Sequence, residues 1–409
     1  MAQHIAYAIY YAANKVAKMT AITTMDPLLP EESRGLENLA TDLVAKASGL
    51  TGRVNPVLAA GIGNLIRSMN CYYSNLIEGH QTLSVDIDRA LNSDFAQEPK
   101  RRNLQKEARA HIEVQRLIDR GEAPSPVVST EFITWVHREF CERLPDELLW
   151  ITNPDTDEKL RVVPGELRKR NVKVGRLVPI DPDDIPAFLN RFTEAYNSPT
   201  LSKLRKIIGV AASHHRLLWI HPFLDGNGRV TRLFSHAWLR ELAVGSELWA
   251  VSRGLARQVD NYKNALAAAD QPRRGDLDGR GNLTQQGLND FCDFFLATCV
   301  DQVAFMESLL EPAELLRRIE IWCEEETRAR RLPRNSWPLL REAVLAGEFS
   351  RGLAAKLTGY ETRQARTVLN TLIDQGYLSS EGPRDSVRLG FPAKIIDRWF
   401  PRLYVAPAG

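Results

Sequence analysis

The sequence has few cysteines, no long apolar run and almost no net charge. Its five cysteines are odd in number and share no metal-ligand spacing, which argues against a disulfide framework or a cysteine-based zinc site. A net charge of +2, with 25% charged and 44% hydrophobic residues, excludes a disordered chain and a protein that coats nucleic acid over its whole surface. Residues 5–14 are apolar, but no basic segment precedes them and Lys15 follows, which is typical of neither a signal peptide nor a membrane span. We therefore expect a soluble, cytoplasmic protein that does not bind a membrane.

The length of 409 residues is enough for two or three domains, each with its own core. Apolar residues recur at helical spacing through most of the chain, and no internal repeat or low-complexity tract stands out. The fold class we expect is mainly α. We predict an N-terminal helical region over residues 1–120, a central core over 121–312, and a linker helix with a C-terminal module over 313–409.

The most informative stretch is residues 221–232, which read HPFLDGNGRVTR. The preceding segment, 207–220, is apolar at helical spacing, and Pro222 ends that helix because proline disfavours helix in the residue before it. A helical apolar stripe resumes at Val230. Residues 225–228 therefore form a loop that leads into a helix N-terminus, where free backbone N–H groups and the helix dipole favour a phosphate.

Two side chains of this loop have the chemistry of a catalytic site. His221 is the only one there whose ordinary pKa suits the acceptance of a proton near neutral pH. Asp225 is placed to hold a hard cation such as Mg²⁺, which would bridge phosphate oxygens.

The rest of the loop suits a polyphosphate. Gly226 and Gly228 allow unusual φ angles and a close approach of the backbone to an anion. Arg229 and Arg232 are three residues apart, so they share one helix face and can reach the same ligand. Each feature alone is common and usually structural, but here they converge within twelve residues.

This stretch resembles the motif of the Fic (filamentation induced by cAMP) family, HPFx(D/E)GNGRxxR, and matches it at every specified position. The resemblance implies a Fic-type helical bundle with a short β-hairpin flap, ATP and Mg²⁺ as ligands, and His221 as the catalytic base. It also implies that the nucleotide contacts Asp225, Gly226, Asn227, Gly228, Arg229, Val230, Thr231 and Arg232, with Asp225 as the metal ligand. Phe223 is expected to pack inward and fix the loop.

Residues 74–79 read SNLIEG and follow an apolar helical stripe. On physical grounds alone Gly79 ends a capped helix, and Glu78 shares a face with Ser74 and points to solvent. The stretch also resembles the Fic inhibitory motif, (S/T)xxxE(G/N). That resemblance implies that Glu78 points into the nucleotide site and pairs with Arg232.

Residues 161–180 change character, because valines alternate with polar residues between two glycines. The pattern predicts a short β-hairpin, either as surface decoration or, by resemblance, as the Fic flap. A flap holds a segment of the target protein by main-chain pairing. The resemblance also places four flap residues against the nucleotide, namely Val174, Gly175, Arg176 and Leu177.

Three further residues with aromatic side chains could lie either in the core or at the ligand site. Tyr262 follows the motif at helical spacing, and the family places an aromatic residue near here beside the adenine ring, although a core tyrosine is the alternative. We interpret His137 and His214 as structural.

The C-terminal segment reads as three helices and a hairpin, a pattern that looks like a winged helix-turn-helix. From Arg331 onward there are 12 Lys and Arg residues against 7 Asp and Glu, a net charge of +5. Arg363, Gln364 and Arg366 lie opposite the apolar stripe of the third helix. Contact with DNA is one interpretation; docking of a protein or stabilisation of a dimer is another, because fold does not fix function.

By resemblance, the chain is expected to be a protein adenylyltransferase (AMPylator). It would transfer AMP from ATP to a Ser, Thr or Tyr hydroxyl of a target protein held along residues 161–180, under inhibition by Glu78. The alternatives are removal of AMP by the same site, with Glu78 orienting a water, and a DNA-binding regulator whose core senses nucleotide. We expect a homodimer. The target protein is not specified by the sequence.

Overall fold

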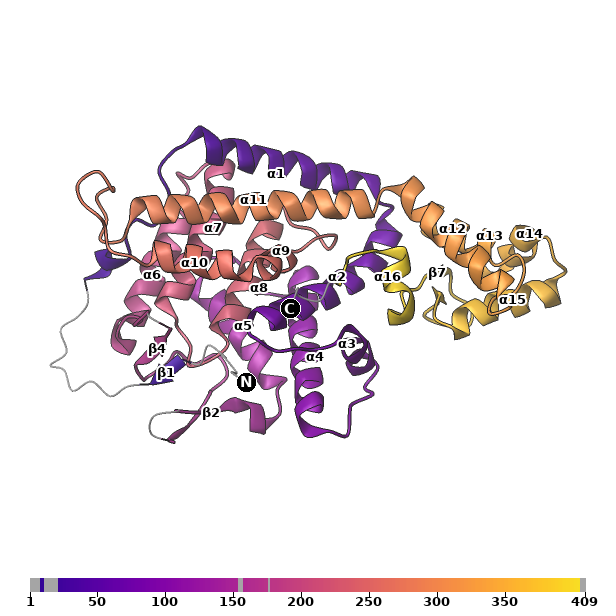
Figure 1. Cartoon of the computed structure of the whole chain (residues 1–409), viewed down its shortest axis with the longest axis horizontal. Helices are drawn as coiled ribbons and strands as arrows, with labels where there is room; N and C mark the ends of the chain where they lie inside the picture. The colour runs from indigo at the N-terminus through magenta and orange to yellow at the C-terminus, as the bar shows by residue number, and fades with distance from the viewer. Residues whose placement is uncertain (1–7, 11–20, 154–156, 176, 405–409) are drawn as a thin grey trace. The chain divides into compact units, whose positions relative to one another are not determined.

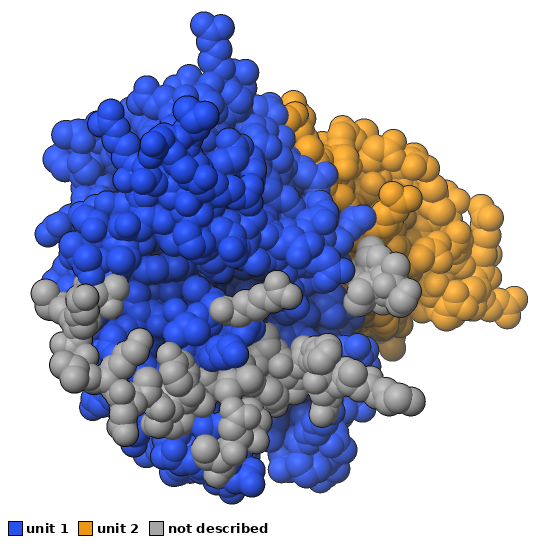
Figure 2. Space-filling view, turned by 60° about the vertical axis from the view of Figure 1, so that its left-hand side comes forward, with its two compact units in different colours: residues 1–45, 70–246, 250–302 blue, residues 46–69, 247–249, 303–409 orange. Residues whose placement is uncertain are grey.

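The structure is a computed structural model that describes residues 8–10, 21–153, 157–175 and 177–404, with backbone only for residues 8–10. The described chain is mainly helical, as predicted (Figure 1). It divides into two compact units, shown in blue and orange in Figure 2. Unit 1 comprises residues 1–45, 70–246 and 250–302, and unit 2 comprises residues 46–69, 247–249 and 303–409. This division does not follow the three predicted domains, whose boundaries stay a prediction.

Unit 1 contains the motif and most of the helices. Those that lie wholly within it are α3 (Ser84–Leu91), α4 (Pro99–Asp119), α5 (Thr130–Glu142), α6 (Ile185–Tyr196), α7 (Lys203–Ile220), α8 (Asn227–Glu241), α9 (Ser252–Arg257) and α10 (Val259–Ala269). Three longer helices contribute residues to both units, namely α1 (Arg34–Arg53), α2 (Pro56–Ile77) and α11 (Gln285–Leu309).

The helices that flank the motif, α7 and α8, pack against each other in the core of unit 1. Helix α7 begins where the Ser202 hydroxyl accepts a hydrogen bond from the Arg205 N–H, a standard N-cap. Aromatic rings of α6 pack against aromatic rings of α8. Phe192 and Tyr196 of α6 lie 5.7 Å from Phe234 and 5.9 Å from Trp238, respectively, between ring centroids. The motif loop is thus held between two buried helices.

Two small antiparallel sheets complete unit 1. Strand β2 (Trp150–Thr152) pairs with β3 (Lys159–Arg161), and β4 (Val172–Val174) pairs with β1 (Ala8–Tyr10), which lies beside it in Figure 1. The short hairpin predicted over residues 161–180 is present, but it is confined to 172–177. There Val174 and Leu177 exchange both backbone hydrogen bonds, at 2.9 Å each, around Gly175 with φ of +58°. Arg161 instead ends the β2–β3 hairpin.

Unit 2 ends with the helices and strands of the C-terminal segment. They are α12 (Pro312–Arg328), α13 (Trp337–Leu345), β5 (Glu348–Phe349), α14 (Ala354–Thr358), α15 (Thr362–Asp374), β6 (Leu378–Ser379), β7 (Val387–Leu389) and α16 (Ile396–Trp399). The three strands form one sheet in the order β5-β7-β6. On α15 the predicted stripe is buried, with Ile373 only partly so, and Arg363, Gln364 and Arg366 are exposed. The assignment to a winged helix-turn-helix stays a prediction.

The described residues bear on two expectations, one about the cysteines and one about membrane-spanning helices. Every cysteine is a free, buried thiol. Among the described helices, none combines the length and the apolar character needed to cross a membrane.

Candidate active site

The motif loop is closed by its own side chains. Helix α7 ends at His221, which adopts the left-handed conformation with φ of +51°, a rare state that is concentrated at functional sites. The Asn227 side chain then bridges the loop, because its Oδ1 accepts from the Phe223 N–H at 2.9 Å and its Nδ2 donates to the Phe223 carbonyl at 2.8 Å. Phe223 is fully buried, as expected, and stacks on His137 at 3.9 Å between ring centroids. His137 therefore has a structural role.

The start of α8 has the form of an anion cradle. Gly226, at φ of +80°, is the N-cap residue, and the first N–H groups of the helix have no partner within it. A Cβ at Gly228 would overlap the carboxylate of Glu78, so only glycine allows an anionic group this close to the helix. Val230 and Thr231 are buried, and the Val230 N–H is bonded to the Gly226 carbonyl at 3.0 Å, so the cradle consists of the N–H groups that precede them.

Arg232 is bound to residues 74–78, which belong to the segment that resembles the Fic inhibitory motif. Its Nη2 donates to Glu78 Oε1 at 2.5 Å, its Nε to Ser74 Oγ at 2.9 Å, and Nη2 also lies 3.2 Å from the Ser74 carbonyl. Burial alone would raise the pKa of Glu78, but the charges of Arg232 and Arg229 outweigh it and lower that pKa. Glu78 is therefore an anion in the cradle, and not a solvent-facing residue of a capped helix.

Arg229 has a carboxylate partner that the sequence analysis missed. Its Nη1 forms an ion pair with Glu107 of α4, its Nη2 lies 3.8 Å from Asp225 Oδ2, and its guanidinium lies over the Phe140 ring at 5.1 Å. Glu107 is only 5% exposed, among the buried alanines of α4. A glutamate inside an apolar helical stripe was the available signal, because buried charges are nearly always paired.

His221 is a weaker base than the sequence predicts. Burial, with the positive charge of Arg168, lowers its pKa to about 4, below the neutral range expected from an ordinary histidine. Arg168 is buried itself and anchors the loop. Its Nε donates to the His221 carbonyl at 2.8 Å and its backbone N–H to the Pro222 carbonyl at 2.9 Å.

Asp225 has the environment expected of a carboxylate that binds a cation. Its side chain is 52% exposed, and partial burial together with the charge of Glu78 raises its pKa. Within the described part of the chain, no three His, Cys, Asp or Glu side chains converge to form a protein-only metal site. One carboxylate is nevertheless enough for Mg²⁺, which is commonly held by a single carboxylate and substrate phosphates.

The structure describes the residue predicted to contact adenine and three of the four predicted flap contacts. Tyr262 is 2% exposed and its hydroxyl lies 2.7 Å from His214 Nε2, so it has no face open to an adenine ring and is a core residue. Val174, Gly175 and Leu177 form the tight turn described above. Arg176 lies outside the described residues. Arg168, which lies within residues 161–180, joins this region to the motif loop by its hydrogen bonds to the carbonyls of His221 and Pro222.

A cavity of about 490 Å³ opens beside the cradle. It is lined on one side by Glu78, His80, Glu107, Asp225, Gly226 and Arg229, and on the other by apolar residues of α5 and the β2–β3 hairpin. This cavity gives a ligand access to Arg229, Glu107 and Glu78.

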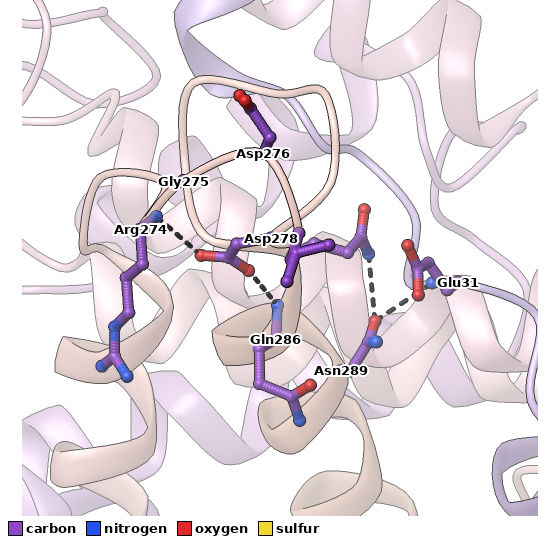
Figure 3. Close-up of a pocket in the computed structure, with 9 residues that line it drawn as sticks. Glu31, Arg274, Gly275, Asp276, Asp278, Gln286 and Asn289 are labelled. Carbon is purple, nitrogen blue, oxygen red and sulfur yellow. Dashed lines mark hydrogen bonds between the residues drawn. The ribbon is translucent and has the colours of Figure 1, made fainter.

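A second hollow, shown in Figure 3, lies away from the motif at the loop that joins α10 to α11. The Asp278 carboxylate is used within the loop. Asp278 accepts hydrogen bonds from the backbone N–H groups of Arg274 and Gln286, both at 2.9 Å, and Asn289 accepts one from Glu31 (Figure 3). These contacts organise the loop, and no catalytic pair is formed there.

Comparisons with known proteins agree with the motif. Residues 127–239 match the Fic/DOC family model. Over 75 residues, 18% of this chain, the sequence is 41% identical to protein adenylyltransferase Fic of Drosophila willistoni, and the match spans 15% of that protein's length. A matching segment of the same length in the Drosophila erecta protein of that name is 40% identical and again spans 15% of its length.

Among solved structures, a Fic family protein from Desulfovibrio desulfuricans G20 has a similar fold, with a TM-score of 0.50. The similarity covers 88% of this chain and 97% of that one, at 18% sequence identity, which shows the fold alone. Residues 127–239 thus form a Fic/DOC domain related to that of the adenylyltransferases, and they include the loop with His221 and the start of α8.

Proposed function

Starting from the Fic/DOC domain at residues 127–239, we propose that this chain is a protein adenylyltransferase that Glu78 inhibits. The observation that carries the proposal is the position of the Glu78 carboxylate. It lies at the N-terminus of α8, bound to Arg232 and in the space that a side chain on Gly228 would fill. An anion-binding site that is occupied by a carboxylate of the same chain suits a phosphate-binding enzyme held in an inactive state.

The proposed reaction transfers AMP to a hydroxyl group of a target protein. His221 accepts the hydroxyl proton while the hydroxyl oxygen forms a bond to the α-phosphorus of ATP. The bond from that phosphorus to the oxygen bridging to the β-phosphorus breaks, and pyrophosphate leaves. The N–H groups at the start of α8, with Arg229 and Arg232, stabilise the charge that develops on the leaving group. Asp225 would hold Mg²⁺, which offsets phosphate charge when bound.

A pKa of about 4 for His221 gives this reaction a specific pH dependence. The histidine accepts a proton only when neutral, so activity is present above its pKa and is lost as the pH falls through it. For the Glu78→Gly variant, we expect kcat/KM for AMP transfer to be flat from about pH 6 to pH 8 and to fall below about pH 5. A loss of activity centred near pH 6.5, the value of an ordinary histidine, would contradict the assignment.

We further propose that the target protein binds as a strand along β4. In support, the backbone of β1 already pairs with β4, with Ile9 opposite Lys173, so this edge accepts an additional strand. The N–H and C=O groups of Val174 are both bonded to Leu177. Because successive backbone groups of a strand point to opposite edges, the N–H of Lys173 is directed toward β1. A target would replace β1 there.

This arrangement predicts opposite effects for two changes at the strand edge. Deleting residues 1–20 frees the edge, so modification of a target should increase several-fold. Lys173→Pro removes the N–H that pairs, so target modification should fall at least tenfold, while hydrolysis or binding of ATP stays unchanged. Lys173→Ala is the matched control and should behave as wild type. If the proline and alanine variants modify targets equally, strand pairing is not how targets bind.

The assay that tests the function itself uses the Glu78→Gly variant with α-³²P-ATP and cell lysate. A labelled protein band that requires His221 supports the proposal. Release of AMP from an already modified protein would instead favour the reverse activity with Glu78 orienting a water. Binding of DNA fragments that changes with ATP, without any labelled protein, would favour a nucleotide-sensing regulator. The homodimer and the DNA or protein partner of the C-terminal module stay predictions.

A further inference from the structure

The inhibitory segment, which Ser74 and Glu78 attach to Arg232, has a further attachment beyond Glu78. Helix α2 ends in a Schellman motif: the Gly79 N–H bonds to the Leu76 carbonyl at 3.0 Å and the His80 N–H to the Asn75 carbonyl at 2.9 Å. Gly79 has φ of +83°, as this motif requires. The motif fixes the direction in which the chain leaves the helix, and it places the His80 side chain two residues beyond Glu78.

His80 reaches the buried glutamate of α4. Its Nδ1 lies 3.1 Å from Glu107 Oε2, and because a carboxylate can only accept, the imidazole N–H is the donor. The other oxygen of Glu107 pairs with Arg229 of the motif helix. One buried carboxylate therefore joins the inhibitory segment to α8. This chain of contacts, His80–Glu107–Arg229, is separate from the pair that Glu78 makes with Arg232.

We infer that His80 and Glu107 form a second latch, which holds the inhibitory segment (residues 74–80) against the motif helix. The inference rests on the proposed function for its consequence, which is that the latch strengthens inhibition. His80 is a positioning residue in this scheme. It contacts no reacting group, and it acts by restricting how far Glu78 can move away from the cradle.

The geometry explains why the Glu78–Arg232 pair alone would not hold the inhibitory segment in place when ATP binds. Glu78 and the ATP phosphates compete for the same arginine and the same N–H groups, so the Glu78–Arg232 pair is the one that ATP disrupts. Glu107 is 5% exposed, and its Oε2, the atom bonded to His80, is not the atom paired with Arg229, so this contact persists when a phosphate takes the place of Glu107 at Arg229. A segment held on both sides of Glu78, by Ser74 at Arg232 and by His80 at Glu107, returns its carboxylate to the cradle more often than a segment held on the Ser74 side alone.

The test is His80→Ala in two backgrounds. With Glu78 present, losing the partly exposed His80–Glu107 hydrogen bond should raise the rate of AMP transfer about fivefold, the factor that the typical net contribution of one hydrogen bond, about 1 kcal/mol, gives. In the Glu78→Gly background the latch has nothing to position, so His80→Ala should leave the rate unchanged. Gln81→Ala, at the exposed next residue, is the matched control and should change neither rate.

A readout without catalysis keeps the inference separate from the proposed function. In hydrogen exchange, the amides of Gly79 and His80 should lose protection in His80→Ala and not in Gln81→Ala. Loss of protection in a protein whose Glu78→Gly variant transfers no AMP would support the latch and refute the adenylyltransferase. Unchanged exchange would overturn the latch, as would an equal rise in rate in both backgrounds, because His80 would then act on the chemistry and not through Glu78.

Discussion

The Glu78→Gly variant should transfer AMP between ten and a hundred times faster than the wild type. Arg232 is bound to Glu78 Oε1 at 2.5 Å, so on the proposed function it would be unable to bind the terminal phosphate of ATP, which the carboxylate would also repel. A hydrogen bond to a charged group contributes about 1.5–3 kcal/mol. Since about 1.4 kcal/mol corresponds to a factor of ten, removing the competing carboxylate gives an increase of this size.

A second contact in the structure should keep Arg232 in position to bind a phosphate after Glu78 is removed. Its Nε remains bonded to Ser74 Oγ at 2.9 Å, so Arg232 keeps its orientation when Glu78 is removed. The gain should therefore depend on Arg232, and the double variant Glu78→Gly with Arg232→Ala should show little of it. The measurement is the initial rate of labelled AMP incorporation by the wild type, Glu78→Gly and the double variant at equal ATP concentration.

The matched control is Glu78→Gln, which keeps the size of the side chain and removes its charge. It should be activated almost as strongly as Glu78→Gly if repulsion and pairing cause the inhibition. Activation by glycine alone would instead point to a looser helix end beside Gly79. Equal rates for wild type and both variants would remove the inhibitory role of Glu78.

Local sequence patterns were sufficient to predict the parts of the site that depend on neighbouring residues. Pro222 and the glycines of the motif identified the helix-loop-helix, and the spacing on α15 identified its buried stripe. The contact of Glu78 with Arg232 joins residues far apart in the chain. It was predicted only because two motifs resemble one family, and not from any property of residues 74–79 alone.

The missed contacts are all long-range. Glu107 reaches Arg229 across α4 and α8, and nothing near Glu107 in the sequence identifies that partner. Arg168 was placed in the flap, but its role as an anchor of the His221 carbonyl depends on the packing of two distant segments. The pairing of β1 with β4 joins Ala8 to Val174, which are far apart in the sequence. Burial also explains the shifted pKa of His221, because desolvation is a property of the folded environment.

Tyr262 was assigned to the adenine on helical spacing and family resemblance. Spacing fixes which residues share a face of α10, but it does not say whether that face meets a ligand or the core. In the structure the hydroxyl of Tyr262 is bonded to His214, whose other nitrogen lies 2.8 Å from Ser235 Oγ. The buried pair of Tyr262 and His214 thus satisfies its hydrogen bonds within the protein. A buried, hydrogen-bonded position is the more common one for a tyrosine.

His221→Ala, introduced into the activated Glu78→Gly protein, should lower AMP transfer by at least about 10²–10⁴-fold. In the proposed reaction the imidazole removes the proton from the attacking hydroxyl, and its buried neighbour Arg168 cannot replace it, because that side chain approaches the His221 carbonyl and not the ring. ATP binding should be largely retained. The groups expected to hold the phosphates are the N–H groups of α8 with Arg229 and Arg232, which do not depend on the imidazole.

The backbone at His221 calls for a second variant. With φ of +51°, the residue lies in the left-handed region, where alanine is strained and asparagine is tolerated much better. His221→Asn should therefore keep the thermal stability of its parent more closely than His221→Ala, while it is just as inactive, because an amide cannot act as a base at neutral pH. Calorimetric titration with ATP and initial-rate assays separate the two effects. A stable His221→Asn protein that still transfers AMP would show that another group accepts the proton. A stable variant that no longer binds ATP would mean that His221 holds the nucleotide and is not the base.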